Sequence, residues 1–260
     1  MSYDNLSKKL ESKIEKKLLS KARKKTLDDG FKKNKVVNEV LDKKTIMTLY
    51  HMINEKIIAY VNGAISAGKE SVVFWAVDTH SKNIALKIYL VTTSNFKKRT
   101  PYIQGDPRFN KIKKGTRNLV HLWAQKEFRN MSQCYDSNLS VPRPISLENN
   151  VLAMDFIGTG GSPAPLLQES DVNEDDYLSA IDFIQKLYNN AKLVHGDFSE
   201  YNIFKTEKGL VFFDLGSAVD LRHPNSLIFL KRDINNITRF FSKRGISVKD
   251  PSEVFEDLIK

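Results

Sequence analysis

The sequence predicts an α+β protein, with a small antiparallel sheet in its first half and a mostly helical second half. Three short runs of β-branched and aromatic residues, separated by turns, lie between residues 57 and 89. Two long helical patterns follow residue 173. Between these halves, glycine and proline gather in a flexible junction made of Gly158, Gly160, Gly161, Pro163 and Pro165. We therefore expect two lobes that meet near this junction.

Composition excludes several classes of protein. At 260 residues and 41% hydrophobic content, the chain can bury the core of one large domain or of two lobes. It has no run of about 18 apolar residues, and its first residues lack the layout of a signal peptide, so we expect no membrane span and a cytoplasmic protein. Cys134 is the only cysteine, which excludes internal disulfides and favours a packed, inert thiol.

The charge of the chain is basic and uneven. A formal net charge of +10 favours polyanionic partners such as nucleic acid. Residues 1–35 hold many lysines, and an apolar residue recurs there at every fourth position, at Leu6, Leu10, Ile14 and Leu18. This pattern predicts a basic helical extension with one apolar stripe. Such a helix fits either a solvated element packed on the body of the protein or an arm that faces RNA.

The first half is expected to begin with a short helix from Asp42 to Asn54. Three antiparallel strands should follow, at 57–61, 71–77 and 84–89. The segment 92–118 has no clear period and is rich in lysine and arginine, and loops of this length are usually functional or disordered. A helical pattern returns from Leu119 to Tyr135.

The second half should contain a strand pair, a hairpin and two long helices. The strands are expected near Ile145 and at 151–157. Asn173 is a candidate N-cap for a helix that runs to about Asn190, and a later helix should span about 226–243. We expect three parts in all: an extension at 1–35, a first lobe at 36–157 with a 92–118 loop and a hinge at 154–158, and a second lobe at 158–260.

Three polar residues stand at spacings of 5 and 12 residues in the second half, namely Asp197, Asn202 and Asp214. Asn202 and Asp214 adjoin the strand-like runs Asn202–Phe204 and Val211–Phe213. At this spacing an Asp can accept a hydroxyl proton while an Asn and a second Asp hold magnesium on a nucleotide. Ordinary turn residues on a hairpin would look the same, so the pattern needs support from other motifs.

A glycine loop lies between the first two expected strands. Gly63–Glu70 nearly spells a phosphate-binding loop that precedes a helix, but Glu70 stands where a hydroxyl should bind magnesium, and a strand follows. A glycine loop between two strands suits a lid over nucleotide phosphates. A plain β-turn would explain the same residues.

Two charged residues complete the pattern. Lys87 alternates with apolar neighbours on the third expected strand and follows Gly68 by 19 residues, the position of a lysine that contacts nucleotide phosphates. Glu127, on the next long helix, is the candidate carboxylate that would hold this lysine. Each residue has an ordinary solvent-exposed alternative. All these motifs in one order, with matching secondary structure, favour a nucleotide site.

The chain resembles the RIO family of atypical protein kinases, and within it the first, Rio-one type subfamily. The resemblance covers roughly Val36 to Phe241. It is carried by the phosphate loop and the catalytic loop, and by several further signatures, at Ser66–Glu70, His195–Asn202, Thr93–Lys97, Gly105–Phe109, Trp123–Arg129, His223–Pro224 and Phe229–Asp233. It implies a truncated bilobal protein-kinase-like fold.

The resemblance also implies roles for single residues. Asp197 would orient or deprotonate the attacking hydroxyl, and Asn202 and Asp214 would bind Mg²⁺, with Mn²⁺ as an alternative metal. Asp214 could also accept a phosphoryl group during ATP hydrolysis. Lys87 would contact the phosphates and pair with Glu127. The remaining contacts to ATP would come from Ile65, Ser66, Gly68, Lys69, Glu70, Met154, Asp155 and Ile157. Of these, Met154 would lie beside adenine, and the backbone of Asp155 and Ile157 would read its edge.

Two departures from conventional kinases limit the functional expectation. Ser199 replaces the usual lysine two residues after the catalytic aspartate, and no Ala-Pro-Glu motif follows Asp214. We expect a serine/threonine kinase that phosphorylates itself, an ATPase, or both, acting in maturation of the small ribosomal subunit. The alternative is a factor that binds RNA or the pre-ribosome and uses its nucleotide site as a conformational switch. The sequence does not identify a protein substrate.

Overall fold

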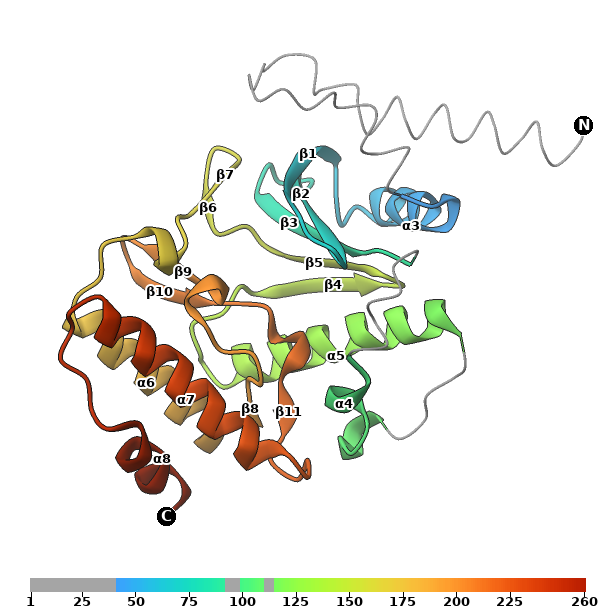
Figure 1. The fold of residues 1–260 in the computed structure, drawn as a ribbon. Helices are drawn as coiled ribbons and strands as arrows, with labels where there is room; N and C mark the ends of the chain where they lie inside the picture. The colour runs from blue at the N-terminus through green and yellow to red at the C-terminus, as the bar shows by residue number, and fades with distance from the viewer. Residues whose placement is uncertain (1–40, 92–98, 110–114) are drawn as a thin grey trace, which may run out of the picture. The chain divides into compact units, whose positions relative to one another are not determined.

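The computed structural model describes residues 41–91, 99–109 and 115–260, and Figure 1 shows their elements. The basic helix expected at 1–35 lies outside the described residues, as do parts of the basic 92–118 loop. The chain divides into two compact units. The described part of the first unit consists of 41–91, 145–156 and 160–162, and that of the second consists of 99–109, 115–144, 157–159 and 163–260. The lobe boundaries expected from the sequence stay a prediction.

The first unit is built on a five-stranded sheet with the strand order β1-β2-β3-β5-β4. The strands span Tyr60–Ala67 (β1), Ser71–Val77 (β2), Asn83–Tyr89 (β3), Pro144–Glu148 (β4) and Val151–Asp155 (β5). The pairs β1–β2, β2–β3 and β3–β5 are antiparallel. The expected antiparallel sheet is therefore confirmed, with β2 at its predicted bounds.

Helix α3 (Lys43–Asn54) covers one face of this sheet. Asp42 caps its first turn by accepting a hydrogen bond from the N–H of Thr45 at 2.8 Å. Leu49 and Met52 of α3 belong to one buried cluster with alternate residues of the strands, among them Phe74, Leu86 and Ala153. The helix expected from Asp42 to Asn54 thus forms and supplies one side of the core.

The strand expected at 57–61 begins later than its β-branched residues suggested. The N–H groups of Ile57 and Ile58 donate to the C=O of Met52, at 3.0 and 3.3 Å. Lys56 has a φ of 60°, which is typical of the residue that ends a helix. These two isoleucines therefore close the end of α3, and burial of Ile58 in the core explains why an apolar pair stands there.

The second unit is mostly helical, as expected. Its helices are α4 (Thr100–Ile103), α5 (Thr116–Asp136), α6 (Glu174–Asn189), α7 (Ser226–Lys243) and α8 (Pro251–Ile259). Asn173 and Asp176 form a capping box at the start of α6, which confirms the predicted N-cap. α6 and α7 lie side by side, with α8 against α7 (Figure 1).

Short strands and 3₁₀ turns connect these helices. The paired strands are β6 (Gly158–Thr159) with β7 (Ser162–Pro163), β8 (Leu193–Val194) with β11 (Val219–Asp220), and β9 (Ile203–Thr206) with β10 (Gly209–Phe212). The described parts of the segment 92–118, which was expected to be a long loop, contain α4, a 3₁₀ turn at Pro107–Phe109 and the first turn of α5. These pieces are too short to produce a visible period in the sequence. Among the described residues, the helices are too short or too polar to span a membrane.

Candidate active site

The predicted phosphate loop lies on β1 and the turn that follows it. Ile65 and Ser66 belong to β1, so the loop expected from Gly63 is strand as far as Ala67. Two irregularities in the β1–β2 register, at Val61/Gly63 and Ala64/Ser66, let a glycine-containing segment continue the pairing. The turn itself is closed by the N–H of Gly68, which donates to the C=O of Ser71 at 2.8 Å.

The remaining residues of this loop are accessible to a ligand in different degrees. Gly68 and Lys69 are exposed, whereas Glu70 is half-buried and its C=O accepts a hydrogen bond from the N–H of Leu90 at 2.8 Å. β2 follows the turn directly, so the strand that the sequence predicted after the loop is confirmed. The turn is therefore a β-hairpin tip and has no helix N-terminus with which to bind phosphate.

Lys87 and Met154 share one face of the sheet. Antiparallel partners point to the same side, and Lys87 is paired with Leu152, while Met154 is paired with Ala85, two residues before Lys87. The opposite face of the sheet carries Leu86 and packs on α3. Lys87 is 9% exposed, and its Nζ lies 5.4 Å from the centroid of the Tyr89 ring.

The two predicted adenine-reading residues that follow Met154 lie at the end of the sheet and just beyond it. Asp155 is the last residue of β5, and its carboxylate accepts a hydrogen bond from Lys82 Nζ at 2.8 Å. Ile157 belongs to the second unit, where its C=O accepts from the N–H of Ala164 at 2.9 Å. Their contacts with a nucleotide base stay predictions.

Glu127 is buried in the middle of α5, with 1% of its surface exposed. The sequence had left open an exposed helix glutamate, and burial excludes that alternative. Lys87 and Glu127 belong to different units, each described by itself, so their pairing stays a prediction.

Asp197, Asn202 and Asp214 are brought together within the second unit by local hydrogen bonds. Asn202 Nδ2 donates to the C=O of Asp197 at 2.8 Å. The N–H of Phe213 donates to the C=O of Asn202 at 3.0 Å, so Asp214 follows a residue bonded to Asn202. The β9–β10 hairpin between them is the strand pair that the sequence indicated.

The atoms that this arrangement offers suit a hard divalent cation. The bond from Asn202 to Asp197 uses the amide nitrogen of Asn202, which leaves its amide oxygen as a potential ligand. Asp214 and Asp197 add carboxylate oxygens, and Asp197 is exposed. Oxygen donors of these types are those that Mg²⁺ takes in proteins, together with substrate phosphates. The residues therefore fit the expected metal.

Asp233 holds the predicted catalytic loop, His195–Asn202, from the side of α7. Its carboxylate accepts the N–H of Gly196 at 2.7 Å and the N–H of Phe198 at 3.1 Å. Burial raises the pKa of Asp233 to about 7, although the two N–H donors favour the charged form. Arg232, next to it, donates to the C=O of Gly196. Sequence reasoning noted this stretch only as a family signature and assigned it no role.

His195 is a buried neutral support of the same loop. Its Nε2 lies 3.3 Å from the C=O of Phe213, and its ring meets Phe198 edge-on. Burial lowers the pKa of His195 despite the opposing charges of Asp197 and Asp214. Phe198 also stacks on Phe183 of α6, so an aromatic core lies under the loop. The loop is thus rigidly held while Asp197 itself stays exposed.

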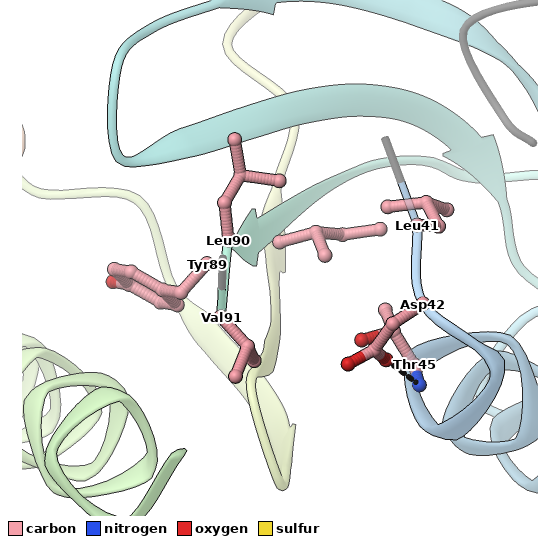
Figure 2. A pocket seen from close by; sticks show the side chains of 7 residues that line it. Leu41, Asp42, Thr45, Tyr89, Leu90 and Val91 are labelled. Atoms are coloured by element: carbon pink, nitrogen blue, oxygen red, sulfur yellow. Dashed lines mark hydrogen bonds between the residues drawn. The ribbon is translucent and has the colours of Figure 1, made fainter. Parts of the chain in front are cut away.

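The first unit contains a small hollow between the start of α3 and the end of β3. Figure 2 shows its lining, in which Leu41, Asp42 and Thr45 at the start of α3 face Leu90 and Val91 after β3. It contains none of the predicted nucleotide contacts. Next to the hollow, the side-chain amide of Asn150 donates to Thr45 Oγ1 at 2.9 Å and to the C=O of Tyr89 at 2.8 Å. These two bonds connect the start of α3 to the end of β3, so the hollow lies at a structural contact between the two elements.

Comparison with known proteins places these features in a family. A family model described as RIO domain matches residues 72–254. The chain is 35% identical over 229 residues to the serine/threonine-protein kinase RIO1 of Caenorhabditis elegans, covering 86% of this chain and 45% of that protein. The human RIO1 is 37% identical over 226 residues, covering 85% and 40%. The RIO-type serine/threonine-protein kinase Rio1 of Methanocaldococcus jannaschii is 39% identical over 228 residues, covering 87% and 76%.

A solved structure shows the same fold. The Rio2 kinase of Chaetomium thermophilum, in a complex described as ADP/Mg²⁺-phosphoaspartate, matches with a TM-score of 0.63 at 24% identity. The match covers 81% of this chain and 65% of that one. The chain spans less than half the length of the two animal relatives.

Proposed function

Because this chain belongs to the RIO domain family, we propose that it is a RIO-type serine/threonine kinase that uses ATP and Mg²⁺. The proposal rests on two hydrogen bonds, which tie Asn202 to Asp197 and tie Asn202 to Phe213, the residue before Asp214. It includes phosphorylation of the chain by itself and hydrolysis of ATP.

In the kinase reaction, a serine or threonine hydroxyl attacks the γ-phosphorus of ATP. The hydroxyl proton passes to Asp197, the bond from the γ-phosphorus to the bridging oxygen breaks, and ADP leaves. Mg²⁺, when bound, would neutralise the charge of the phosphates, and Asn202 and Asp214 would be its protein ligands. Lys87 would bind the phosphates and Glu127 would orient Lys87. The N–H bonds to Asp233 keep the backbone on both sides of Asp197 fixed while the proton moves.

The nucleotide is proposed to lie on the face of the sheet that carries Lys87 and Met154. Ile65, Ser66 and the hairpin tip at Gly68, Lys69 and Glu70 would cover its phosphates. The backbone of Asp155 and Ile157 would read the edge of adenine. The ADP and Mg²⁺ in the Rio2 kinase complex support a nucleotide and a metal of this kind.

The first test is incubation with labelled ATP and Mg²⁺. We expect Asp197→Asn to lower phosphate transfer by about a hundredfold or more, because it removes the proton acceptor. Asp182→Asn is the matched control, since Asp182 is an exposed aspartate on α6 that pairs with Lys186. Undiminished transfer in Asp197→Asn would contradict the assignment.

The chemical stability of the label separates the two activities. In the hydrolysis reaction a carboxylate oxygen of Asp214 would attack the γ-phosphorus, ADP would leave, and water would then cleave the acyl phosphate. An acyl phosphate is released by hydroxylamine, whereas phosphoserine resists it. Label that is sensitive to hydroxylamine and absent from Asp214→Asn would identify the ATPase cycle.

The basic character of the chain leads us to propose a second function, which is binding to ribosomal RNA. The net charge of +10 and the resemblance to RIO kinases support action on the pre-ribosomal small subunit, either alongside catalysis or with the nucleotide site as a switch. We expect binding to small-subunit ribosomal RNA to weaken steadily as salt is added, since cationic residues release counterions from phosphates. Affinity that does not change with salt would contradict this electrostatic interaction.

A further inference from the structure

Two side chains of α5 donate hydrogen bonds to the backbone just after Asp214. Lys126 Nζ donates to the C=O of Gly216 at 3.2 Å and to the C=O of Ala218. One turn later, Asn130 Nδ2 donates to the C=O of Leu215 at 2.7 Å and again to the C=O of Ala218 at 2.8 Å. Residues 215–218, here called the post-aspartate turn, therefore have three of their carbonyls held by one helix.

Lys126 is an unusual residue for this task because it is fully buried. Placing an ammonium group in the interior is costly unless other groups compensate it. Asp106 supplies a carboxylate oxygen 3.9 Å from Lys126 Nζ. Arg108 in turn fixes Asp106 through bonds of 2.9 Å from Nε and 2.7 Å from Nη2. Burial opposes ionisation of Asp106, but the hydrogen bonds and charge of Arg108 outweigh it and lower the pKa of that carboxyl.

The backbone at Asp214 explains why such a support is needed. Asp214 has φ 61° and ψ 55°, the left-handed region that residues other than glycine rarely adopt. A residue stays there only when its surroundings hold it, and such strain gathers at functional sites. The post-aspartate turn begins at the next residue, so its bonds to α5 determine in which direction the chain leaves Asp214.

We propose that Lys126 and Asn130 are positioning residues, which fix the post-aspartate turn and thereby aim the carboxylate of Asp214 at the metal. The inference rests on the proposed function, since it takes Asp214 as a metal ligand. It assigns α5 a second task beside that of Glu127. Lys126 and Asn130 would orient the metal-binding carboxylate of Asp214, while Glu127, next to Lys126, is the expected partner of Lys87.

The test measures affinity for ADP by calorimetry, once with Mg²⁺ and once with a chelator. Lys126→Met keeps the length of the side chain but removes the ammonium group, and Asn130→Ala removes the amide and leaves all charges in place. Cys134→Ala is the matched control, because Cys134 is fully buried one turn further along α5. Binding of Mn²⁺ to each variant, followed by electron paramagnetic resonance, gives a readout that is independent of turnover.

We expect both variants to need about tenfold more metal or higher for half-saturation, as is usual when a group that orients a metal ligand is lost. Their affinity for ADP in the chelator should stay close to that of the parent protein and of Cys134→Ala. A merely structural role would weaken both affinities together, or would leave metal binding as it is in Cys134→Ala. Either result would overturn the inference.

Thermal melts identify the variants that fold, and each folded variant decides the test by itself. If the parent protein binds ADP without any dependence on metal, the proposed function fails and the inference fails with it. If the parent depends on metal and the folded variants match it, only the inference fails. The two failures are thus distinguishable in one set of titrations.

Discussion

Gly105 occupies a backbone conformation and a space that both favour glycine. Its φ is +90°, in the region that side-chain-bearing residues avoid. A Cβ atom at this position would lie 2.8 Å from Cδ of Pro224, closer than carbon atoms approach one another. Gly105 therefore lets the segment at 99–109 lie directly against the chain that enters α7.

His223 reinforces the same contact by hydrogen bonds. Its Nδ1 accepts the N–H of Asn225 at 3.1 Å, which leaves Nε2 as the nitrogen that donates. Nε2 then donates to the C=O of Pro101 at 3.0 Å and of Gln104 at 2.9 Å. A single imidazole thus satisfies two carbonyls of the segment that holds Gly105.

We predict that Gly105→Ala lowers the free energy of unfolding by about 2 to 4 kcal/mol, from the strained φ together with the steric overlap. Gly209→Ala separates the two causes, because Gly209 also has a positive φ, +112°, but no atom lies within 4 Å of the place that its new methyl group would take. It should cost only about 1 to 2 kcal/mol. Chemical denaturation gives both values, and equal losses would show that the contact with Pro224 is unimportant.

At the scale of elements, strong periodic patterns could be predicted from the sequence. α7 has the expected bounds of about 226–243, because its apolar positions recur at helical spacing along the whole segment. The N-cap of α6 at Asn173 was predictable for a local reason, since a capping box needs only residues three apart. By contrast, Ile57 and Ile58 were misassigned to a strand, because β-branched residues also serve to bury the end of a helix.

The candidate site likewise contains residues that local sequence patterns reveal and residues that only distant contacts reveal. The proximity of Asp197, Asn202 and Asp214 could be predicted because one loop and one hairpin hold them, and their roles stay predictions. Asp233 acts on a backbone N–H that is 37 residues away, and Lys126 acts on a carbonyl that is 90 residues away. Each side chain bonds to a backbone peptide group, and because every residue has such a group, the sequence does not indicate which one is the partner. Such supports become visible only when the packing of helices is known.

At the scale of the whole molecule, the buried charge of Lys126 should leave a signature in stability. Burial lowers the pKa of Lys126 from its usual 10.5 to about 7, although the charge of Asp106 opposes this. Between these two values the unfolded chain binds a proton that the folded chain lacks. Stability therefore rises with pH in this interval, and below about pH 7 the full cost of burying the charge is present.

Cys134 limits the range in which this signature can be measured. Burial raises the pKa of the Cys134 thiol from 9.0 to about 12. Above pH 9 the unfolded thiol loses its proton while the folded thiol keeps it, so stability falls with pH there. The contribution of Lys126 is best isolated between the folded value for Lys126, about 7, and the unfolded value for Cys134, 9.0.

We predict that the free energy of unfolding of the parent protein rises across this window relative to that of Lys126→Met, by up to about 1.4 kcal/mol per pH unit. Urea denaturation at several pH values measures the difference, in which the contributions of groups that do not interact with Lys126 cancel. Lys186→Met is the matched control, since Lys186 is half-exposed and pairs with Asp182 at the surface of α6. Its curve should run parallel to that of the parent. If Lys126→Met also runs parallel, Lys126 keeps its charge when folded, and its bonds to the post-aspartate turn are those of an ammonium group at every pH of the window.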